Sequence, residues 1–492
     1  RNIASYSAIH GKTINIKDAY DSTEFDFSGT KNFDESTGYR SRSFLTVPLK
    51  NYQDDVIGVL QLLNALDEKT GKVIPFADDL QPQIEALASQ AAVALDNQNL
   101  LDAQKNLLDS FIELMASAVD AKSPYTGGHC QRVPMLTEML TDAVCQARNE
   151  PFRDFTLNEE QWYEIHIGAW LHDCGKVTTP EYVVDKATKL ETITDRIHEV
   201  RMRFEVLKSE AIIECQEKII AGEGDPDELR AELDKTLARI DDDYAFIAEC
   251  NLGGEFMAED KQERVRQIAQ QQWTRTLDDR IGVAHEELKR KEREPASELP
   301  CREPLLQDRV DHIIEHDSVV HAADPDNKYG FKIEVPEHKY NLGEVYNLCI
   351  ERGTLTPEER FKINDHIVQT IVMLEQLPFP RHLERVPEIA GGHHEKMDGT
   401  GYPKRLKGEE MSIPARVMAI ADVFEALTAA DRPYKKAKTL SESIKIMSFM
   451  VKDQHLDPDL FRLFLQSGVY MQYAEKFLLP EQIDKVDIND YL

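Results

Sequence analysis

The stretch GGHHEKMDGTGYP, residues 391–403, places two histidines side by side and follows them with a glycine-rich loop. Neighbouring residues on a regular helix point about 100° apart, so adjacent side chains rarely share a face. Both imidazole rings can still converge on one metal ion at a helix end, just before the turn that Gly399 and Gly401 indicate. Two solvated histidines on a loop are the alternative, and this stretch alone slightly favours it. The rest of the chain decides between the two readings.

The overall composition is that of a large acidic globular protein. The chain has 492 residues, enough for two to four domains with their own cores. Hydrophobic residues make up 41% and charged residues 30%, which is typical of a globular protein with a charged, helical surface. A net charge of −31 argues against general binding to nucleic-acid polymers or anionic membranes.

The cysteines and the apolar runs indicate the compartment. Seven scattered cysteines without a CxxC pair predict a reducing cytoplasm rather than a disulfide framework. No run of about eighteen or more apolar residues is present, so we expect no membrane-spanning segment in this chain. The chain begins at Arg1 without Met, and we expect that a preceding segment has been cut away.

The first part of the chain predicts a small sensor fold and a long helix. From Arg1 to about Ile74 the pattern is strand-like, with SFLTVPLK (43–50) and DVIGVLQLLNA (55–65) as strands and Gln53–Asp55 in the turn between them. From about Asp78 to Lys122 a helical heptad pattern follows. Its stripe consists of Ile84, Leu87, Ala91, Ala94, Gln98, Leu101, Lys105, Leu108, Ile112, Met115 and Val119. A dimeric coiled coil is favoured over one amphipathic helix packed on its own domain.

The remainder reads as one helical domain interrupted by a polar block. Residues 153–208 are helical around EEQWYEIHIGAWLHDCGK, and residues 341–454 are compact and helical again. Between them, residues 209–340 are rich in charged side chains with helical spacing, which predicts an inserted helical arm. The phrase KATKLETITDRI before the arm is similar to ERGTLTPEERFKI after it, as expected if a segment was inserted.

Histidines and acids gather in the two compact stretches that flank the arm. They are His129, His172, Asp173, His366, His393, His394 and Asp422. Ionisable groups in apolar helical segments cost free energy unless they are paired or bind metal, so convergence on a metal centre is the better explanation for so many. Imidazole and carboxylate ligands without a thiolate pair suit Fe, Mn, Zn, Co or Ni. The excess of ligands over the need of one ion indicates two ions, which can bind a phosphate and activate water.

These residues also carry a family resemblance. HDCGK (172–176) and HHEKMDGTGYP (393–403), with YTGGHCQRV (125–133) before them and ADVFEALTAADRPYK (421–435) after them, resemble the HD-GYP family of HD phosphohydrolases. The resemblance covers roughly residues 109–208 and 341–454. It implies an all-α domain that hydrolyses cyclic di-GMP to linear pGpG, in some members continuing to GMP, with water as the attacking group.

The resemblance also implies roles for individual residues. One metal would be bound by His172, Asp173 and Asp422, with His129 as a further candidate, and the second by His366, His393 and His394, with Asp173 as the catalytic bridge. Iron or manganese is expected.

Substrate contacts follow from the same resemblance. Lys176 would stabilise charge on one phosphate, Arg432 and Lys435 would bind the other, and Tyr402 would help to shape the loop that closes the site. Family members with a third metal carry a glutamate where this chain has Tyr125, so two metals are expected rather than three.

The N-terminal part resembles the second half of a GAF sensor domain through KNFDESTGYRSRSFLTVPLKNYQDDVIGVLQLLN and QIEALASQAAVALDNQNLL. The expected fold is therefore α+β. We expect a partial GAF sensor domain with its exit helix (1–100), a connecting helix (101–122), the HD-GYP domain in two parts (123–208 and 341–492) and a charged insertion (209–340). The GAF ligand is an unidentified small molecule, and the chain would form a homodimer through the connecting helix.

Three other functions compete with this one. HIIEH (312–316) fits the H-x-x-E-H pattern of inverzincin metalloproteases, although a solvated helix face is the simpler reading. The domain could be a non-catalytic sensor of cyclic dinucleotides, but sensors derived from enzymes usually lose ligands that this chain retains. It could also be an enzyme for another cyclic dinucleotide, such as cyclic GMP-AMP.

Overall fold

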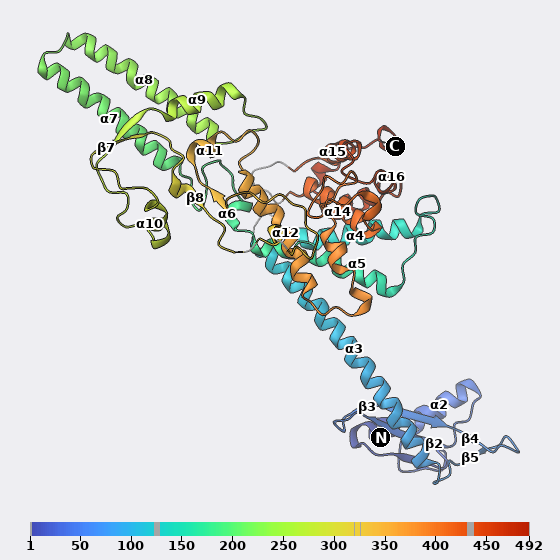
Figure 1. Cartoon of the computed structure of the whole chain (residues 1–492). Helices are drawn as coiled ribbons and strands as arrows, with labels where there is room; N and C mark the ends of the chain where they lie inside the picture. The colour runs from blue at the N-terminus through green and yellow to red at the C-terminus, as the bar shows by residue number, and fades with distance from the viewer. Residues whose placement is uncertain (1, 123–127, 319, 325, 431–436, 492) are drawn as a thin grey trace. The chain divides into compact units, whose positions relative to one another are not determined.

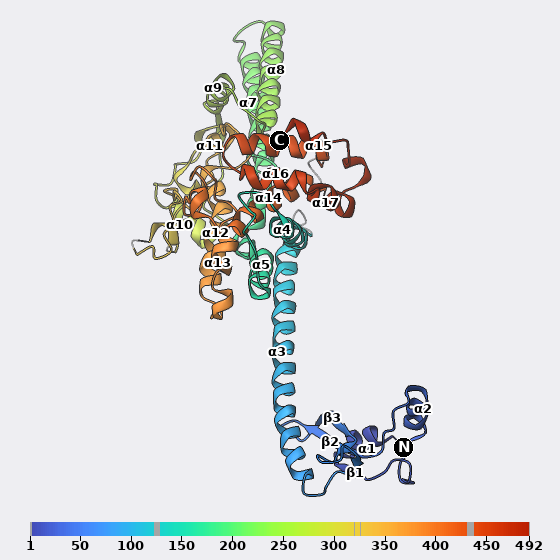
Figure 2. The same ribbon diagram turned by 90° about the vertical axis from the view of Figure 1, so that its right-hand side faces the viewer.

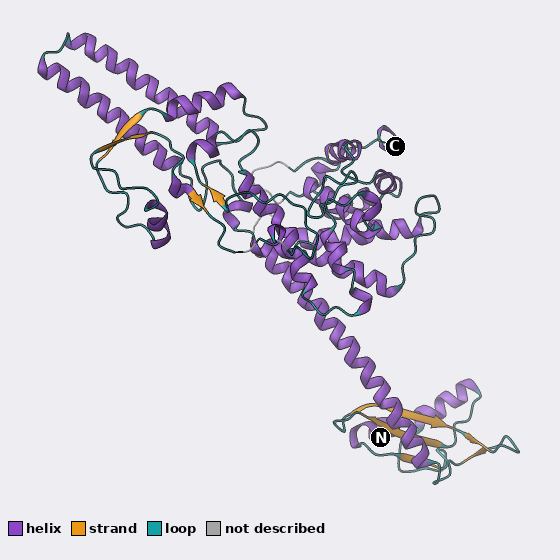
Figure 3. Cartoon of the chain, viewed as in Figure 1, coloured by secondary structure: helices purple, strands orange, loops and turns teal. Residues whose placement is uncertain are grey.

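The computed structural model describes residues 2–122, 128–318, 320–324, 326–430 and 437–491. The chain forms two compact units, Arg1–Phe111 and Ile112–Leu492, and each is described by itself. Strands are concentrated in the N-terminal unit and in two small sheets of the insertion, whereas the rest is helical (Figure 3). The overall α+β class expected from the sequence is confirmed.

The N-terminal unit is built on a three-stranded antiparallel sheet in the order β1 (Ile14–Ile16), β2 (Phe44–Lys50), β3 (Val56–Leu63). Strands β2 and β3 are the two that the sequence predicts, and Phe44 pairs with Leu63. The short strands β4 (Ala65–Leu66) and β5 (Val73–Ile74) pair with each other. The turn between β2 and β3 lies where it was expected, because the Asn51 side chain accepts hydrogen bonds from the backbone N–H groups of Gln53 and Asp55.

Two helices in this unit were not predicted, and the expectation of strand-like structure throughout residues 1–74 was wrong there. Helix α1 (Ile3–His10) begins at Asn2, whose side chain accepts from the N–H groups of Ala4 and Ser5. Helix α2 (Ser28–Thr37) contains few large apolar residues, so its sequence shows little helical periodicity. Both helices are short enough that packing decides their conformation more than local propensity does.

Helix α3 (Gln81–Lys122) confirms the long helix expected from the heptad pattern. Its first turns pack Ala88 against Leu45 and Val47 of the sheet. Its last turns bury Ile112 and Val119 in cores of the C-terminal unit. These two stripe positions therefore serve intramolecular packing rather than a coiled-coil seam.

The C-terminal unit is a helical domain with its main core between the first and last helices. The helices are α4 (His129–Gln146), α5 (Glu159–Leu171), α6 (Glu181–Val184), α11 (Glu344–Leu348), α12 (Pro357–Glu375), α13 (Val386–Gly391), α14 (Ile413–Thr428), α15 (Leu440–Lys452), α16 (Pro458–Gln466) and α17 (Val469–Phe477). Buried side chains of α4, α14, α15, α16 and α17 form the largest apolar cluster. No helix in the described ranges is both long and apolar enough to cross a membrane.

The insertion projects from this domain as a long antiparallel pair, α7 (Ile197–Ala221) and α8 (Pro226–Asn251), which lie side by side in both views (Figures 1 and 2). Helix α7 begins before residue 208, so it runs through the boundary assigned from the sequence. The insertion also contains α9 (Glu259–Ala269), α10 (His285–Lys291), the pair β6 (Gln272–Arg275) with β7 (Cys301–Pro304), and β8 (Ile313–Ile314), which pairs with β9 (Tyr340–Asn341). A separate apolar cluster around Phe204, Ile247 and Val265 forms its core.

A close backbone crossing joins the two halves of the helical domain. The 3-10 turn η2 (Cys174–Thr178) lies directly on α12, where the Gly175 N–H donates to Thr370 Oγ1 over 2.9 Å. A Cβ at Gly175 would lie 1.9 Å from the backbone oxygen of His366 and 2.6 Å from the Thr370 nitrogen. Only glycine allows this approach, which sets the distance between the HDCGK turn and the histidine of α12.

We therefore predict that Gly175→Ala lowers the free energy of unfolding by about 1–3 kcal/mol, because the backbones must separate to accept the methyl group. Gly254→Ala is the matched control, since nothing lies within 4 Å of the Cβ it would add. Chemical denaturation of both variants measures the difference. Equal stability of the two variants would contradict the close crossing.

Candidate metal centre

Seven ionisable side chains from separate elements meet inside the helical domain. His129 opens α4, His172 and Asp173 lie between α5 and η2, His366 lies on α12, His393 and His394 follow α13, and Asp422 lies on α14. All of the candidates for metal ligands that the sequence analysis named are therefore brought together. His172, Asp173 and His393 are 0%, 2% and 2% exposed, so this is a buried cluster rather than a solvated loop.

Three of the imidazole rings are oriented by the same hydrogen bond to the backbone. The Nδ1 atoms of His172, His366 and His393 each pair with the backbone oxygen of the residue three positions earlier, at 2.7, 2.5 and 2.7 Å. A carbonyl only accepts, so each Nδ1 carries the proton and each Nε2 keeps its lone pair. This arrangement presents three Nε2 atoms to the centre of the cluster, as metal-binding histidines require.

The Nε2 atoms lack the protein partners that buried polar atoms normally have. His393 Nε2 is buried without a hydrogen-bond partner in the described part of the chain. His366 Nε2 and His394 Nε2 lie 3.3 Å apart. With its Nδ1 protonated, His366 directs the lone pair of its Nε2 toward His394, where a shared cation would be bound by both rings. The donor atoms and their orphaned state thus fit a divalent metal ion.

The ligand atoms form two groups on either side of Asp173, and a third group of His172, Asp173 and His393 overlaps both. One group is His129, His172 and Asp422, and the other is His366, His393 and His394, with the ligand atoms of each group within 4.8 Å of one another. Asp173 Oδ2 lies 3.1 Å from His129 Nε2 and 3.2 Å from His172 Nε2, on the side of the first group. Asp173 Oδ1 lies 3.3 Å from His366 Nε2, in the second group. The Asp173 carboxylate therefore faces both groups, with one oxygen directed toward each.

Burial and charge set the protonation of the cluster. Burial lowers the pKa of His393 to about 4, helped by the neighbouring His172, and burial brings the pKa of His394 well below its usual value. Burial alone would raise the pKa of Asp173, yet the charge of Lys176 and the nearby His172 hold it well below its ordinary range. Neutral imidazole and ionised carboxylate are the forms that bind metal.

Half-buried Lys176 of η2 forms an ion pair with the buried Asp173, which immediately precedes η2. Burial would lower the pKa of Lys176, but the carboxylates of Asp173 and Asp422 raise it, so the ammonium group stays charged. Its Nζ therefore lies beside the bridging carboxylate of Asp173 as a compact cation.

Glu425 and Arg132 belong to the centre, and the sequence analysis missed them. Glu425, 1% exposed, contacts His129 Nδ1 and also pairs with Arg132 at 2.6 Å. Glu425 lies three residues after Asp422 on α14, one helical turn away on the same face. That spacing could have identified it as the residue that orients His129.

The loop after the paired histidines is held by another acid that was not predicted. The buried carboxylate of Glu395 accepts from the backbone N–H groups of Lys404 and Leu406 at 2.6 and 2.9 Å. Gly401 fits against the Glu395 backbone, where a Cβ would lie 2.5 Å from its Cα. Tyr402 stacks on His394, with ring centroids 4.9 Å apart and an angle of 22°. The GYP segment is thus a rigid wall of the centre.

Some residues named from the sequence are not placed. Tyr125, Arg432 and Lys435 lie outside the residues that the structure describes.

The HIIEH stretch is not the helix that a metalloprotease site needs. His312 ends a 3-10 turn and Ile313–Ile314 form β8. Burial lowers the pKa of His312 to about 4, and its Nδ1 accepts from the Arg309 backbone N–H. His316 Nε2 instead lies 3.0 Å from the backbone oxygen of Pro336. The two histidines therefore do not share a helix face.

A buried centre of imidazole and carboxylate ligands in two groups can hold divalent metal ions in a helical domain. Comparison with known families agrees, because the family described as HD domain matches residues 300–460 and the family described as GAF domain matches residues 1–95. The chain thus contains a GAF domain and an HD domain. The HD match begins after most of the insertion, so His172 and Asp173 lie outside its bounds.

Curated relatives share segments of this chain. A Vibrio cholerae protein named 3'3'-cGAMP-specific phosphodiesterase 1 is 36% identical over 141 residues, 28% of this chain and 29% of the relative. A Pseudomonas aeruginosa cyclic di-GMP phosphodiesterase is 43% identical over 86 residues, 17% of this chain and 20% of the relative. A Thermotoga maritima cyclic di-GMP phosphodiesterase is 34% identical over 125 residues, 25% and 33%. The chain spans about 30% of the length of the first relatives.

Metal content should depend on Asp173 more than on any exposed acid. We expect Asp173→Asn to reduce bound metal from about two ions per chain to less than one, because each group loses a charged oxygen. Asp453→Asn, on an exposed position, should change nothing. Elemental analysis of the two purified variants measures this. Equal metal content in both would contradict the bridging role.

Proposed function

We propose that the HD domain is a two-metal phosphodiesterase that opens the ring of cyclic di-GMP to linear pGpG. The observation that carries this proposal is Asp173, whose two oxygens face two separate groups of ligand atoms. The names of the relatives, two of them cyclic di-GMP phosphodiesterases, support the substrate. Two divalent ions, iron or manganese, would supply charge at the phosphate and activate water for attack.

The ligands divide between the two ions as the resemblance implies. His172, Asp173 and Asp422, with His129, would hold one ion, and His366, His393 and His394 the other. Glu425 would fix the ring of His129 without touching the metal, because it contacts Nδ1 while Nε2 faces Asp173. With Tyr125 in place of a glutamate, we propose two ions rather than three.

Lys176 and Tyr402 are the substrate-facing residues among those described. Lys176 would place its ammonium group against the phosphate that is attacked, since the cation already lies beside Asp173. Tyr402 would bound the pocket beside His394. We keep Arg432 and Lys435 as the proposed contacts to the second phosphate, on the strength of the RPYK segment in the sequence.

One observation favours a second substrate. The Vibrio cholerae relative that is 36% identical over 141 residues is named for 3'3'-cGAMP rather than cyclic di-GMP. Cyclic GMP-AMP differs from cyclic di-GMP in one base, so the same phosphate chemistry serves both. A non-catalytic sensor is the remaining alternative, and the complete set of ligands argues against it.

The direct test is hydrolysis of cyclic di-GMP by the full chain loaded anaerobically with Fe(II) or Mn(II). We expect linear product from the wild type and none from Asp173→Ala. Lys176→Ala should slow turnover about 100-fold or more while metal content stays unchanged, because it removes only charge stabilisation. The same assay with 3'3'-cGAMP ranks the two substrates. Absence of turnover of either dinucleotide by metal-loaded wild type would favour the sensor.

We further propose that the chain is a dimer joined along α3. The middle of this helix exposes Leu87, Leu101, Leu108 and Met115 of the predicted stripe, by 58%, 60%, 39% and 40%. A neighbouring ladder at seven-residue spacing, Val93, Leu100, Leu107 and Leu114, is 56–64% exposed. A second copy of the helix would bury the predicted stripe, whereas the second ladder lies about 100° around the helix from Leu101, Leu108 and Met115.

Sedimentation velocity of the full chain tests the dimer. We expect the wild type to sediment as a dimer and the double variant Leu101→Asp, Leu108→Asp as a monomer, because charges would enter the apolar seam. Asn99→Asp with Asn106→Asp is the control at the same spacing on the opposite face. A monomeric wild type at high concentration would contradict the proposal.

The cysteines and the GAF domain support two further proposals, on the compartment and on the sensor ligand. All seven cysteines are unpaired, which is typical of proteins kept in a reducing cytoplasm, and we propose that location. The GAF domain would receive a small ligand of its own, whose signal passes along α3.

A further inference from the structure

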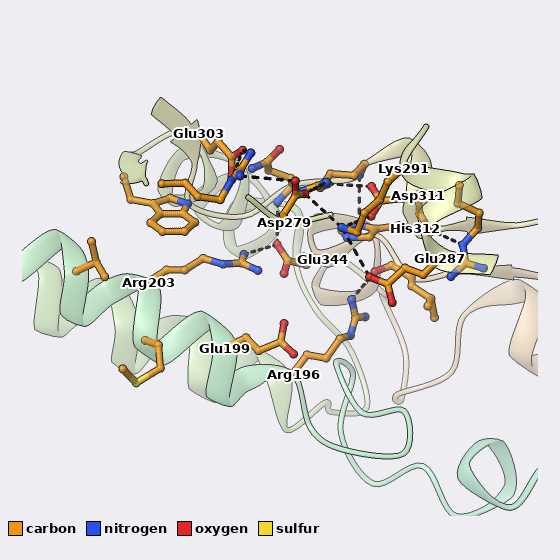
Figure 4. A pocket seen from close by; sticks show the side chains of 18 residues that line it. Arg196, Glu199, Arg203, Asp279, Glu287, Lys291, Glu303, Asp311, His312 and Glu344 are labelled. Carbon is orange, nitrogen blue, oxygen red and sulfur yellow. Dashed lines mark hydrogen bonds and ion pairs between the residues drawn. The ribbon is translucent and has the colours of Figure 1, made fainter. Parts of the chain in front are cut away.

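The insertion and the start of α7 enclose a large cavity, lined mainly by charged residues, that is remote in sequence from the metal ligands. Its volume is about 650 Å³, within the range of small-molecule sites. One wall is α7, and the opposite wall consists of β6, α10 and the segment from Glu303 to His312. None of its lining residues belongs to the metal centre. In Figure 4, Arg196, Glu199 and Arg203 project from α7 toward the other wall.

The wall opposite α7 is fixed by a network of ion pairs. Asp279 pairs with Arg309 at 2.6 Å and with Lys291 at 3.3 Å, and Asp311 pairs with the same two cations at 2.8 and 3.0 Å. Burial opposes ionisation of Asp279, but the hydrogen bond and charge of Arg309 lower its pKa to about 2. This wall is therefore charged and preorganised before any ligand enters.

Three further charged side chains at the cavity form no ion pair with any described residue. In the described ranges, Arg196 and Arg290 form no ion pair, and their guanidinium groups bond only to backbone oxygens, those of Leu190, Leu342 and Asp311. Glu199, between Arg196 and Arg203 on α7, likewise has no ion-pair partner among the described residues. The lining thus offers unused donors for an anion and, beside them, an unused acceptor for N–H groups.

An aromatic side chain with an unused donor completes the lining. Trp273 of β6 borders the cavity, and its indole N–H is buried without a hydrogen-bond partner in the described part of the chain. The indole ring also offers a flat face for a planar group.

We propose that this cavity is a binding site for a mononucleotide. A phosphate monoester suits the free guanidinium donors of Arg196 and Arg290, as arginine commonly binds phosphate. A nucleobase supplies a planar ring for Trp273 and N–H donors for Glu199. Inorganic phosphate or a sugar phosphate would use only the guanidinium groups. The site is separate from the proposed phosphodiesterase centre and does not depend on its activity.

The test is isothermal titration of the full-length protein with GMP, ribose 5-phosphate and inorganic phosphate. We expect GMP to bind and ribose 5-phosphate to bind at least about tenfold more weakly, because it lacks the ring and its donors. Arg290→Gln should weaken GMP binding about tenfold or more through the lost phosphate contact, and Glu199→Gln through the lost base contact.

The controls are exposed neighbours on the same helices, Lys289→Gln on α10 and Glu205→Gln on α7, which do not line the cavity. They should bind GMP as the wild type does. GMP binding that survives both Arg290→Gln and Glu199→Gln would place the nucleotide at another site and overturn the proposal. Absence of GMP binding, or equal affinity for ribose 5-phosphate, would overturn it as well.

Discussion

The buried carboxylate of Asp173 is the interaction on which the helical domain depends. An ionised group that is 2% exposed is costly unless its surroundings compensate for lost water. Here Lys176 supplies a charge from the same turn, and imidazoles from α4, α5 and α12 surround both oxygens. Each contact needs a backbone at a set distance, which is why η2 crosses α12 at Gly175 without room for a Cβ. The fold of this domain is therefore organised around its polar centre as much as around its apolar core.

Much of this centre could be predicted because its signals are local. The adjacent pair His393–His394 at a helix end is unusual in sequence, and the HDCGK motif identifies a second set of ligands, His172 and Asp173. Glu425 escaped prediction because a glutamate in a helix is ordinary until its burial beside His129 is known. Strands β2 and β3 show clear β-pattern, whereas α2 is polar and is held by tertiary contacts such as the buried Asp34, which binds Ser41. Periodicity reports which face is apolar, and it does not report what a short polar helix packs against.

The insertion illustrates the same limit on a larger scale. Its composition predicted a solvated helical arm, and the α7–α8 pair fits that description. Its cavity could not be foreseen, because Arg196, Trp273 and Arg290 are far apart in sequence and individually unremarkable as surface residues. Only the return of the chain through β7 and the 3-10 turn η3 (Val310–His312) brings them to one cavity. Long-range convergence of common residue types leaves no pattern in a single sequence.

The insertion is also more closely joined to the metal centre than an accessory arm would be. Phe331, within it, packs on Ile371 of α12, and the Lys332 backbone N–H donates to the oxygen of Pro403 in the GYP loop over 2.7 Å. On its other flank, Lys186 forms a buried pair with Glu359 in the first turn of α12, at 2.8 Å. A buried ion pair of this kind is strongly destabilising to break, so it holds the chain before the insertion to the helix that carries His366. Since the insertion contacts both α12 and the GYP loop, its folding and the geometry of the metal centre constrain each other.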